Sequence, residues 1–119
     1  MDEIALYNRY GKAVYRVCGR VLYDYLGKPR GYLVGKTIYD SRGEHRGFYH
    51  NQLVLDRMGR ILGYADGAKA NGLALPPAEI PPVPYKNLPA PEQPVSAVER
   101  EFGRFVPAWS MMRLDNMLV

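Results

Sequence analysis

The amino-acid sequence predicts an all-β fold, in which eight short antiparallel strands form four β-hairpins in a meander around a pseudo-four-fold axis. The main observation is a 16-residue unit that recurs four times, without gaps, between Ile4 and Ala68. Each unit also carries two sets of turn residues, and β-branched and aromatic residues fill the short segments between them. Closing four hairpins around an axis would protect the strand edges that an open sheet exposes.

The first turn of each unit begins with Asn or Asp and reaches Gly three residues later. Its members are Asn8 and Gly11, Asp24 and Gly27, Asp40 and Gly43, and Asp56 and Gly59. An Asn or Asp side chain can accept a hydrogen bond from its own downstream backbone, and Gly supplies the positive φ that a three-residue hairpin loop needs. We therefore expect these side chains to stabilise turns. Binding of calcium would instead require several of their oxygens to converge on one ion.

The second turn of each unit and the strand residues complete the prediction. The second turn contains Gly19, Gly35, Asn51 or Gly67, and the uniformly aliphatic column Leu6, Leu22, Ile38 and Val54 is the predicted central core. A further column holds Gly31, Gly47 and Gly63, with Tyr15 as its exception. Because Gly weakens a strand, we expect a close approach there, by an aromatic ring of a neighbouring strand.

The composition changes after the repeats, so the chain divides into three predicted segments. Residues 1-70 form the repeat domain, residues 71-95 a proline-rich extended arm, and residues 96-119 a short helical and apolar C-terminal segment. Eight of the 10 prolines fall within residues 76–94, which favours polyproline II geometry. Ser96 and Glu99 have capping-box spacing for a short helix, and Ser110 is placed to cap a final helical turn.

Charge and composition indicate a non-membrane protein with an excess of positive charge on the repeats. The whole net charge of +4 falls on residues 1–68, because basic and acidic residues are equal in number after them. No apolar run reaches the length of a membrane helix, and the acidic N-terminus does not read as a signal peptide. The single Cys18 fits a reducing compartment, and we expect a cytoplasmic protein without a membrane partner.

The sequence does not predict catalysis, a cofactor or a metal site. His45 and His50 do not have metal-ligand spacing, and a lone cysteine cannot form a structural zinc site. Cys18 and a histidine could be imagined as nucleophile and base, but no motif orients them. We therefore expect a protein that is not an enzyme.

The chain resembles the small bacterial proteins called four-fold beta flower proteins. The resemblance rests on the opening Ile4–Val14, on the Tyr-Asp-x-x-Gly and Gly-aromatic repeats, on the proline-interrupted tail and on the terminal Trp-Ser. It implies a module of four hairpin petals and no particular activity. The chain departs from strict repetition at Tyr15, Arg16 and Leu55.

The preferred functional hypothesis is a binding or assembly module, in which the C-terminal arm packs on the repeats, on a second copy or on a protein partner. One alternative is nucleic-acid binding by basic loop tips, and another is carbohydrate binding by the repeated tyrosines. Function is expected where the repeat is broken, at the loop tips and in the tail. The candidate interaction residues are Arg16, Arg20, Arg30, Lys36, Arg46, Tyr85, Trp109, Met112 and Leu114.

Overall fold

The computed structural model describes residues 3–93 and 97–118, and it consists of short strands with one 3₁₀ turn. The elements are β1 (Glu3–Tyr7), β2 (Ala13–Cys18), β3 (Val21–Tyr23), β4 (Pro29–Val34), β5 (Thr37–Asp40), β6 (His45–His50), β7 (Leu53–Leu55), β8 (Arg60–Tyr64), β9 (Val106–Trp109) and the 3₁₀ helix η1 (Leu114–Asn116). Four hairpins, β1–β2, β3–β4, β5–β6 and β7–β8, are called here petals 1 to 4 in chain order.

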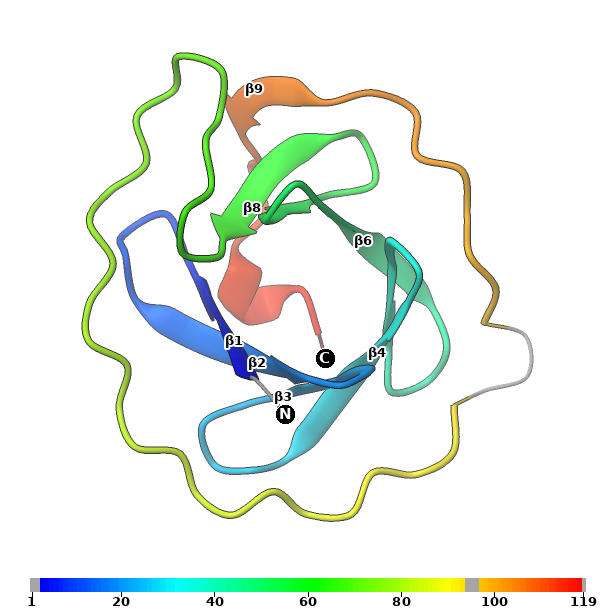
Figure 1. Cartoon of the computed structure of the whole chain (residues 1–119). Coiled ribbons are helices and arrows are strands. Elements are labelled where there is room, and N and C mark those ends of the chain that lie inside the picture. Colours follow the sequence, from blue (N-terminus) through cyan, green and yellow to red (C-terminus); the bar gives the residue numbers. More distant parts are fainter. Residues whose placement is uncertain (1–2, 94–96, 119) are drawn as a thin grey trace.

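The eight strands of the petals close into an antiparallel barrel, which confirms the predicted all-β fold. Each strand pairs with the next along the chain, and β1 pairs with β8 through Tyr7 and Tyr64. A ninth strand, β9, adds to β8 in parallel. The closed ring of petals is seen along its axis in Figure 1. Closure leaves petals 1 and 4 in contact, as the four-fold repeat predicts.

The turn chemistry is also confirmed, with the same bonds in every petal. In petal 3, Asp40 Oδ1 accepts hydrogen bonds from the backbone N–H groups of Arg42 and Glu44 at 2.9 and 3.0 Å, and Gly43 has a φ of 86°. Asn8, Asp24 and Asp56 accept the equivalent pairs of bonds in their own loops. Each side chain therefore holds its own turn, as expected of an Asx residue in a three-residue hairpin loop.

The central core forms from the predicted aliphatic column. Leu6, Leu22, Ile38 and Val54 are all buried in one cluster. The same cluster contains Leu114, Met117 and Leu118 from the C-terminal segment, which we call the plug. In Figure 1 this segment, in red, lies at the centre of the ring of petals. The barrel is thus filled by a segment that begins 50 residues after the end of the last petal strand.

The plug explains the glycine column and corrects the expected reason for it. A Cβ at Gly31 would lie 3.2 Å from Leu118 Cδ2, one at Gly47 would lie 2.9 Å from Met117 Cε, and one at Gly63 would lie 2.8 Å from Leu114 Cδ2. The close approach was predicted correctly, but the neighbours are plug side chains and strand carbonyl oxygens. No aromatic ring is among the nearest atoms at these three positions.

Tyr15 replaces glycine in petal 1, and its place against the plug explains the exception. Its ring is buried in the central cluster, and its hydroxyl donates a hydrogen bond to the Asp115 carbonyl at 3.3 Å. The plug therefore packs against three glycines and one tyrosine ring. This asymmetry lets an irregular segment fit inside a nearly symmetric barrel.

The proline-rich arm and the residues that continue it run around the outside of the petals, as the green, yellow and orange trace in Figure 1 shows; from here on, the arm means residues 71–93 and 97–105. Backbone N–H groups of the arm donate to carbonyls of the petal loops, from Glu79 to Gly11 and from Leu88 to Gly27, both at 2.8 Å. Three petal tyrosines donate their hydroxyl protons to arm carbonyls; the pairs are Tyr64 with Pro76, Tyr32 with Pro91, and Tyr39 with Val98. Because proline lacks an N–H, the arm relies on its carbonyls for many of these contacts.

Two expected helices differ in the structure. Residues 97–102 form neither helix nor strand, so the helix predicted after Ser96 does not form there; Ser96 itself lies outside the described residues. Glu99 instead accepts a bond from the Lys36 backbone N–H at 2.9 Å. The final helical turn is η1, and Arg113, not Ser110, occupies its N-cap position. The Ser110 hydroxyl instead donates a hydrogen bond to Asp56 Oδ2 at 2.6 Å, which ties the C-terminal segment to petal 4.

We expect the stability of the fold to fall in acid, in part through Asp40. Burial disfavours its charged form, but the backbone N–H groups of Glu44 and Arg42 and the Arg46 guanidinium outweigh burial and hold its pKa below the ordinary 3.8. Since the unfolded carboxylate takes up its proton first, stability is lost as the pH falls below about 3.8. Chemical denaturation at several pH values should show a smaller acid loss in Asp40→Asn, which keeps the loop acceptor. An equal acid loss in both proteins would contradict the assignment.

Candidate functional site

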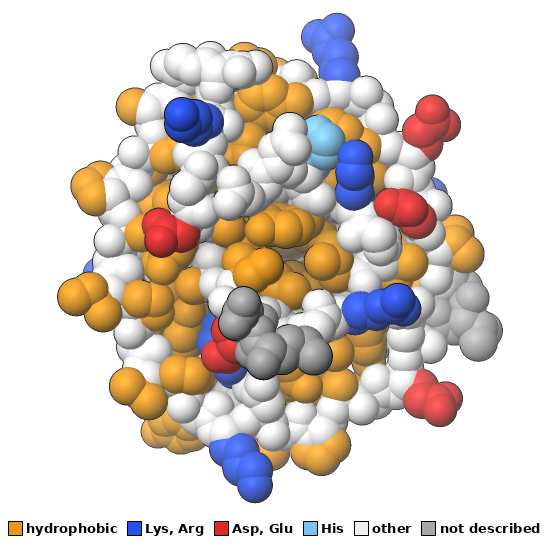
Figure 2. Space-filling view, in the orientation of Figure 1, with side chains coloured by type: hydrophobic (Ala, Val, Ile, Leu, Met, Phe, Trp, Pro, Cys, Tyr) orange, Lys and Arg blue, Asp and Glu red, His pale blue; other side chains and the backbone are white. Residues whose placement is uncertain are grey.

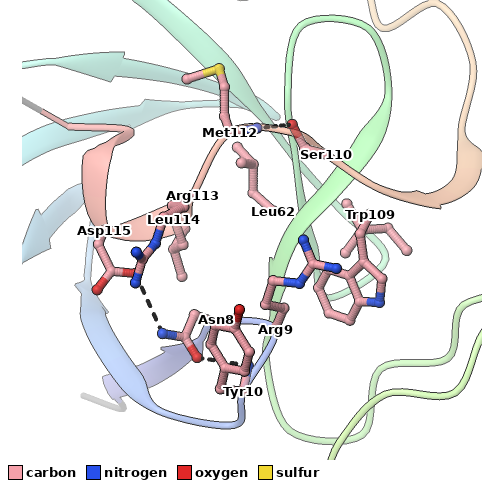
Figure 3. A pocket seen from close by; sticks show the side chains of 11 residues that line it. Asn8, Arg9, Tyr10, Leu62, Trp109, Ser110, Met112, Arg113, Leu114 and Asp115 are labelled. Atoms are coloured by element: carbon pink, nitrogen blue, oxygen red, sulfur yellow. Dashed lines mark hydrogen bonds between the residues drawn. The ribbon is translucent and has the colours of Figure 1, made fainter.

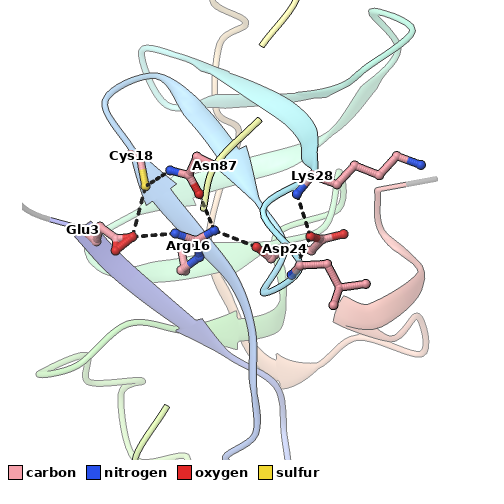
Figure 4. Close-up of polar contacts among 7 residues, drawn as sticks. Glu3, Arg16, Cys18, Asp24, Lys28 and Asn87 are labelled. Atoms are coloured by element: carbon pink, nitrogen blue, oxygen red, sulfur yellow. Dashed lines mark hydrogen bonds and ion pairs between the residues drawn. The ribbon is translucent and has the colours of Figure 1, made fainter. Parts of the chain in front are cut away.

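Arg16 is the most conspicuous break in the repeat, and it is buried, with 3 % of its surface exposed. Its guanidinium donates hydrogen bonds to Glu3 Oε1 at 2.6 Å, to the Asp24 carbonyl at 2.8 Å and to Asn87 Oδ1 at 2.5 Å (Figure 4). It also lies over the ring of Tyr25. Arg16 therefore joins petals 1 and 2 to the arm, and the expectation that it lies on an interaction surface was wrong.

The groups around Arg16 do not activate Cys18. The hydrogen bond from Arg16 lowers the pKa of Glu3, so this carboxylate stays charged. Burial, followed by the hydrogen bond with Glu3, raises the pKa of the Cys18 thiol. A nucleophilic cysteine needs the opposite shift. The polar cluster in Figure 4 is consistent with a structural tie between the N-terminal strand, petal 2 and the arm.

Two further candidate arginines are held by contacts within the protein. Arg30 donates to the Leu118 carbonyl at 2.7 Å, beside the plug. Arg46 Nε donates to Asp40 Oδ2 at 2.8 Å, and its Nη2 is 3.1 Å from Glu44. Arg20 and Lys36, by contrast, are exposed in two-residue turns. Figure 2 shows charged side chains spaced around the near face, with hydrophobic side chains in its middle. Basic side chains do not gather into a single patch on that face.

The candidates of the tail are divided between the core and the surface. Leu114 is buried as part of the plug, so its placement on an interaction surface was wrong. Tyr85 is 68 % exposed on the arm. Trp109 is half-buried against a second hydrophobic cluster that includes Leu55 and Ile61 of petal 4, and Met112 is exposed. Trp109 and Met112 line one pocket, to which Tyr85 does not belong.

Trp109 and Met112 line a small pocket between petal 1, petal 4 and the plug. Figure 3 shows Asn8, Arg9 and Tyr10 of petal 1 next to side chains of the C-terminal segment, with Arg9 beside Trp109. Its lining residues are Asn8, Arg9, Tyr10, Ile61, Leu62, Trp109, Ser110, Met112, Arg113, Leu114 and Asp115. The Arg9 guanidinium lies 5.4 Å from the centre of the Trp109 ring, a cation–π arrangement. The pocket combines an indole, a phenol and two arginines in one place.

We call the accessible surface in and beside this pocket the tail face; it consists of the lining residues Arg9, Tyr10, Trp109, Met112 and Arg113 and of the neighbouring Met111. Met111 is 96 % exposed next to the pocket, and Tyr10 is also exposed. The sequence indicated Trp109 and Met112 but missed Arg9 and Arg113. Arg9 occupies an ordinary loop position, and only docking of the C-terminal segment beside petal 1 brings it to Trp109.

The residues considered for metal binding and sugar stacking are placed differently. Among the described residues, no three His, Cys, Asp or Glu side chains are grouped to hold a metal ion. The repeated tyrosines Tyr7, Tyr23, Tyr32, Tyr39 and Tyr64 are buried, several of them beneath the arm. The tyrosine columns therefore do not offer rings for stacking on a sugar. Across residues 3–93 and 97–118, no helix is long and apolar enough to cross a membrane.

Comparison with known proteins gives one match. A family model described as 4-fold beta flower protein matches residues 4–118. No curated protein and no solved structure matches the chain. The match includes the arm and the plug as well as the petals, so all three segments are part of the family's pattern.

Proposed function

Because this chain belongs to the 4-fold beta flower protein family, whose description specifies a fold and no activity, we propose that it is a non-enzymatic protein-binding module. The arm and the plug pack on the petals of the same chain, so they complete the fold. We assign the partner-binding surface to the tail face. Its exposed methionines and aromatic residues are the single observation that carries this proposal.

The composition of the tail face is typical of protein interfaces. Tyr, Trp, Met and Arg are enriched at the centres of such interfaces, and Lys and Glu are depleted. Flexible Met side chains adapt to an apolar partner surface, and an aromatic ring provides a large contact at low entropic cost. Met111 and Met112 supply the first element, and Tyr10 and Trp109 supply the second.

The charge of the tail face favours an acidic protein partner over a second copy. Arg9 and Arg113 are exposed there, and Asp115 is the acidic residue that lines the same pocket. A two-fold contact between identical tail faces would bring the two arginine pairs together, which is unfavourable. A partner with an apolar anchor flanked by carboxylates would instead match both the apolar and the charged parts.

Nucleic-acid binding is the weaker alternative. Of the five basic residues among the candidate interaction residues, Arg16, Arg30 and Arg46 already bond to groups of the same chain, which leaves Arg20 and Lys36 exposed. These two side chains sit on separate turns. A groove that tracks a phosphate backbone needs a continuous row of such charges.

We expect Met111→Gln combined with Met112→Gln to weaken partner binding by at least about tenfold, because truncating an interface centre commonly has that effect. Both side chains are exposed, so the melting temperature should stay close to that of the parent protein. Partners captured from native cells would be compared quantitatively between the two proteins. Binding of each purified candidate would then be measured by calorimetry.

A matched control is the pair Ile80→Gln and Val83→Gln, which removes exposed apolar groups from the arm instead. It should leave binding unchanged. Equal loss in the control and in the Met variant, or no loss in either, would argue against the tail face. Sedimentation velocity tests whether a second copy of the chain covers the tail face. Self-association that the Met variant abolishes would mean that a second copy, and not an acidic partner, binds there.

A further inference from the structure

A second, polar hollow lies on the side of petals 3 and 4. It is lined by Gly43, Glu44, His45, Arg46, Arg57 and Arg100. Arg46 comes from β6, Arg57 from the loop of petal 4, and Arg100 from the part of the arm that passes these petals. The Arg100 backbone N–H donates to Thr37 Oγ1 at 2.7 Å, which fixes this part of the arm against petal 3. Three arginines from three separate segments therefore surround one open hollow.

The four-fold repeat does not require this cluster. The position of His45 is occupied by Ala13, Pro29 and Ile61 in the other petals, and the position of Arg57 by Arg9, Tyr25 and Ser41. The combination of His45 and Arg46 with Arg57 in the next loop therefore occurs once in the four repeats. The arm then adds Arg100, which has no counterpart because the arm is not repeated. The cluster is a local departure from a symmetric design.

Part of the positive charge in the hollow is uncompensated. Arg46 is paired with the buried Asp40 and with the exposed Glu44. Arg57 and Arg100 are exposed, and neither takes part in an ion pair among the described residues. The pKa of His45 is lowered, first by burial and then by the charges of Arg100 and Arg57, despite its hydrogen bond with the Gly47 carbonyl. Both arginines line the same hollow as this imidazole.

We propose that this hollow binds a phosphate dianion, either free or as the terminal group of a monoester. Guanidinium groups bind phosphate oxygens with paired, charge-assisted hydrogen bonds, and three arginines around one hollow suit a group with three terminal oxygens. The anion would offset the repulsion among Arg57, Arg100 and a protonated His45. Glu44, on the rim, limits the positive charge and so favours a compact ligand over a long polyanion.

The test follows His45 by NMR while the full-length protein is titrated with sodium phosphate and, separately, with phenyl phosphate. Sodium chloride keeps the ionic strength constant. A bound anion favours the imidazolium, so the pKa of His45 should rise, while His50 serves as an internal reference that should not respond. A response to both ligands assigns a monoester site, and a response to phosphate alone assigns a site for the free ion.

Arg57→Gln and Arg100→Gln should each weaken the response by about tenfold in ligand concentration, since each loses a charge-assisted hydrogen bond. Arg42→Gln is the matched control, because Arg42 is exposed on the tip of the petal 3 loop but does not line the hollow. An unchanged His45 pKa would overturn the proposal. So would a rise of equal size at His50, or a response that survives in both hollow variants.

Discussion

Replacing Gly47 with alanine is expected to lower the free energy of unfolding by on the order of 3 kcal/mol, because the added methyl has no room. A Cβ at this position would overlap the Leu55 carbonyl oxygen of the adjacent strand and lie 2.9 Å from Met117 Cε. The methionine side chain can move, but the strand carbonyl is held in the barrel ladder. Urea denaturation followed by circular dichroism gives the free energy directly.

Gly103→Ala is the matched control for this substitution. Gly103 lies in the arm, and a Cβ there would meet no atom within 4 Å. Its substitution should change stability by no more than a few tenths of a kcal/mol, the usual range for an unconstrained surface site. In a Met117→Ala background, Gly47→Ala should still cost about as much as in the parent protein, since the clash with the strand carbonyl remains. Loss of that cost would mean that the plug alone accounts for the glycine.

The petals could be predicted from the sequence because their structure depends on local chemistry. Asp40 and Gly43 lie in the same loop, and the hydrogen bonds of Asp40 Oδ1 reach residues two and four positions away. The same local pattern recurs in each unit, so one misread residue could not change the overall prediction. The aliphatic column followed from the two-residue period of a strand.

The plug and the sites could not be predicted in the same way, because their contacts join distant parts of the chain without a periodic pattern. Tyr15 meets Asp115 across 100 residues, and Arg16 meets Asn87 across 71. Because Arg16 stands where the other repeats have an aromatic residue, the sequence predicts an exposed arginine. Only the docked arm supplies the partner that lets it be buried. The pairing of Arg9 with Trp109 depends on the same docking.

The arm also gives the loop glycines a second role that local chemistry did not indicate. A Cβ at Gly11 would overlap the Pro77 carbonyl, and one at Gly27 would overlap the Lys86 carbonyl. Positive φ alone would tolerate Asn at these positions. The close passage of the arm adds a steric reason for glycine. The same loop residues therefore shape the petal and admit the chain that surrounds it.

Truncating the plug side chain Met117 to alanine is expected to cost about 2–5 kcal/mol of unfolding free energy, as for other large buried side chains. Met117 is fully buried among the four aliphatic residues of the barrel axis, so its loss leaves a cavity that the closed barrel cannot easily collapse. Met111→Ala is the matched control, because it changes the same residue type six positions earlier where the side chain is 96 % exposed. Denaturation midpoints at equal m-value measure the difference. A cost below about 1 kcal/mol for Met117→Ala would contradict this expectation. It would mean that the petals form a barrel that is stable without the plug, with the C-terminal segment bound to it as a separate element.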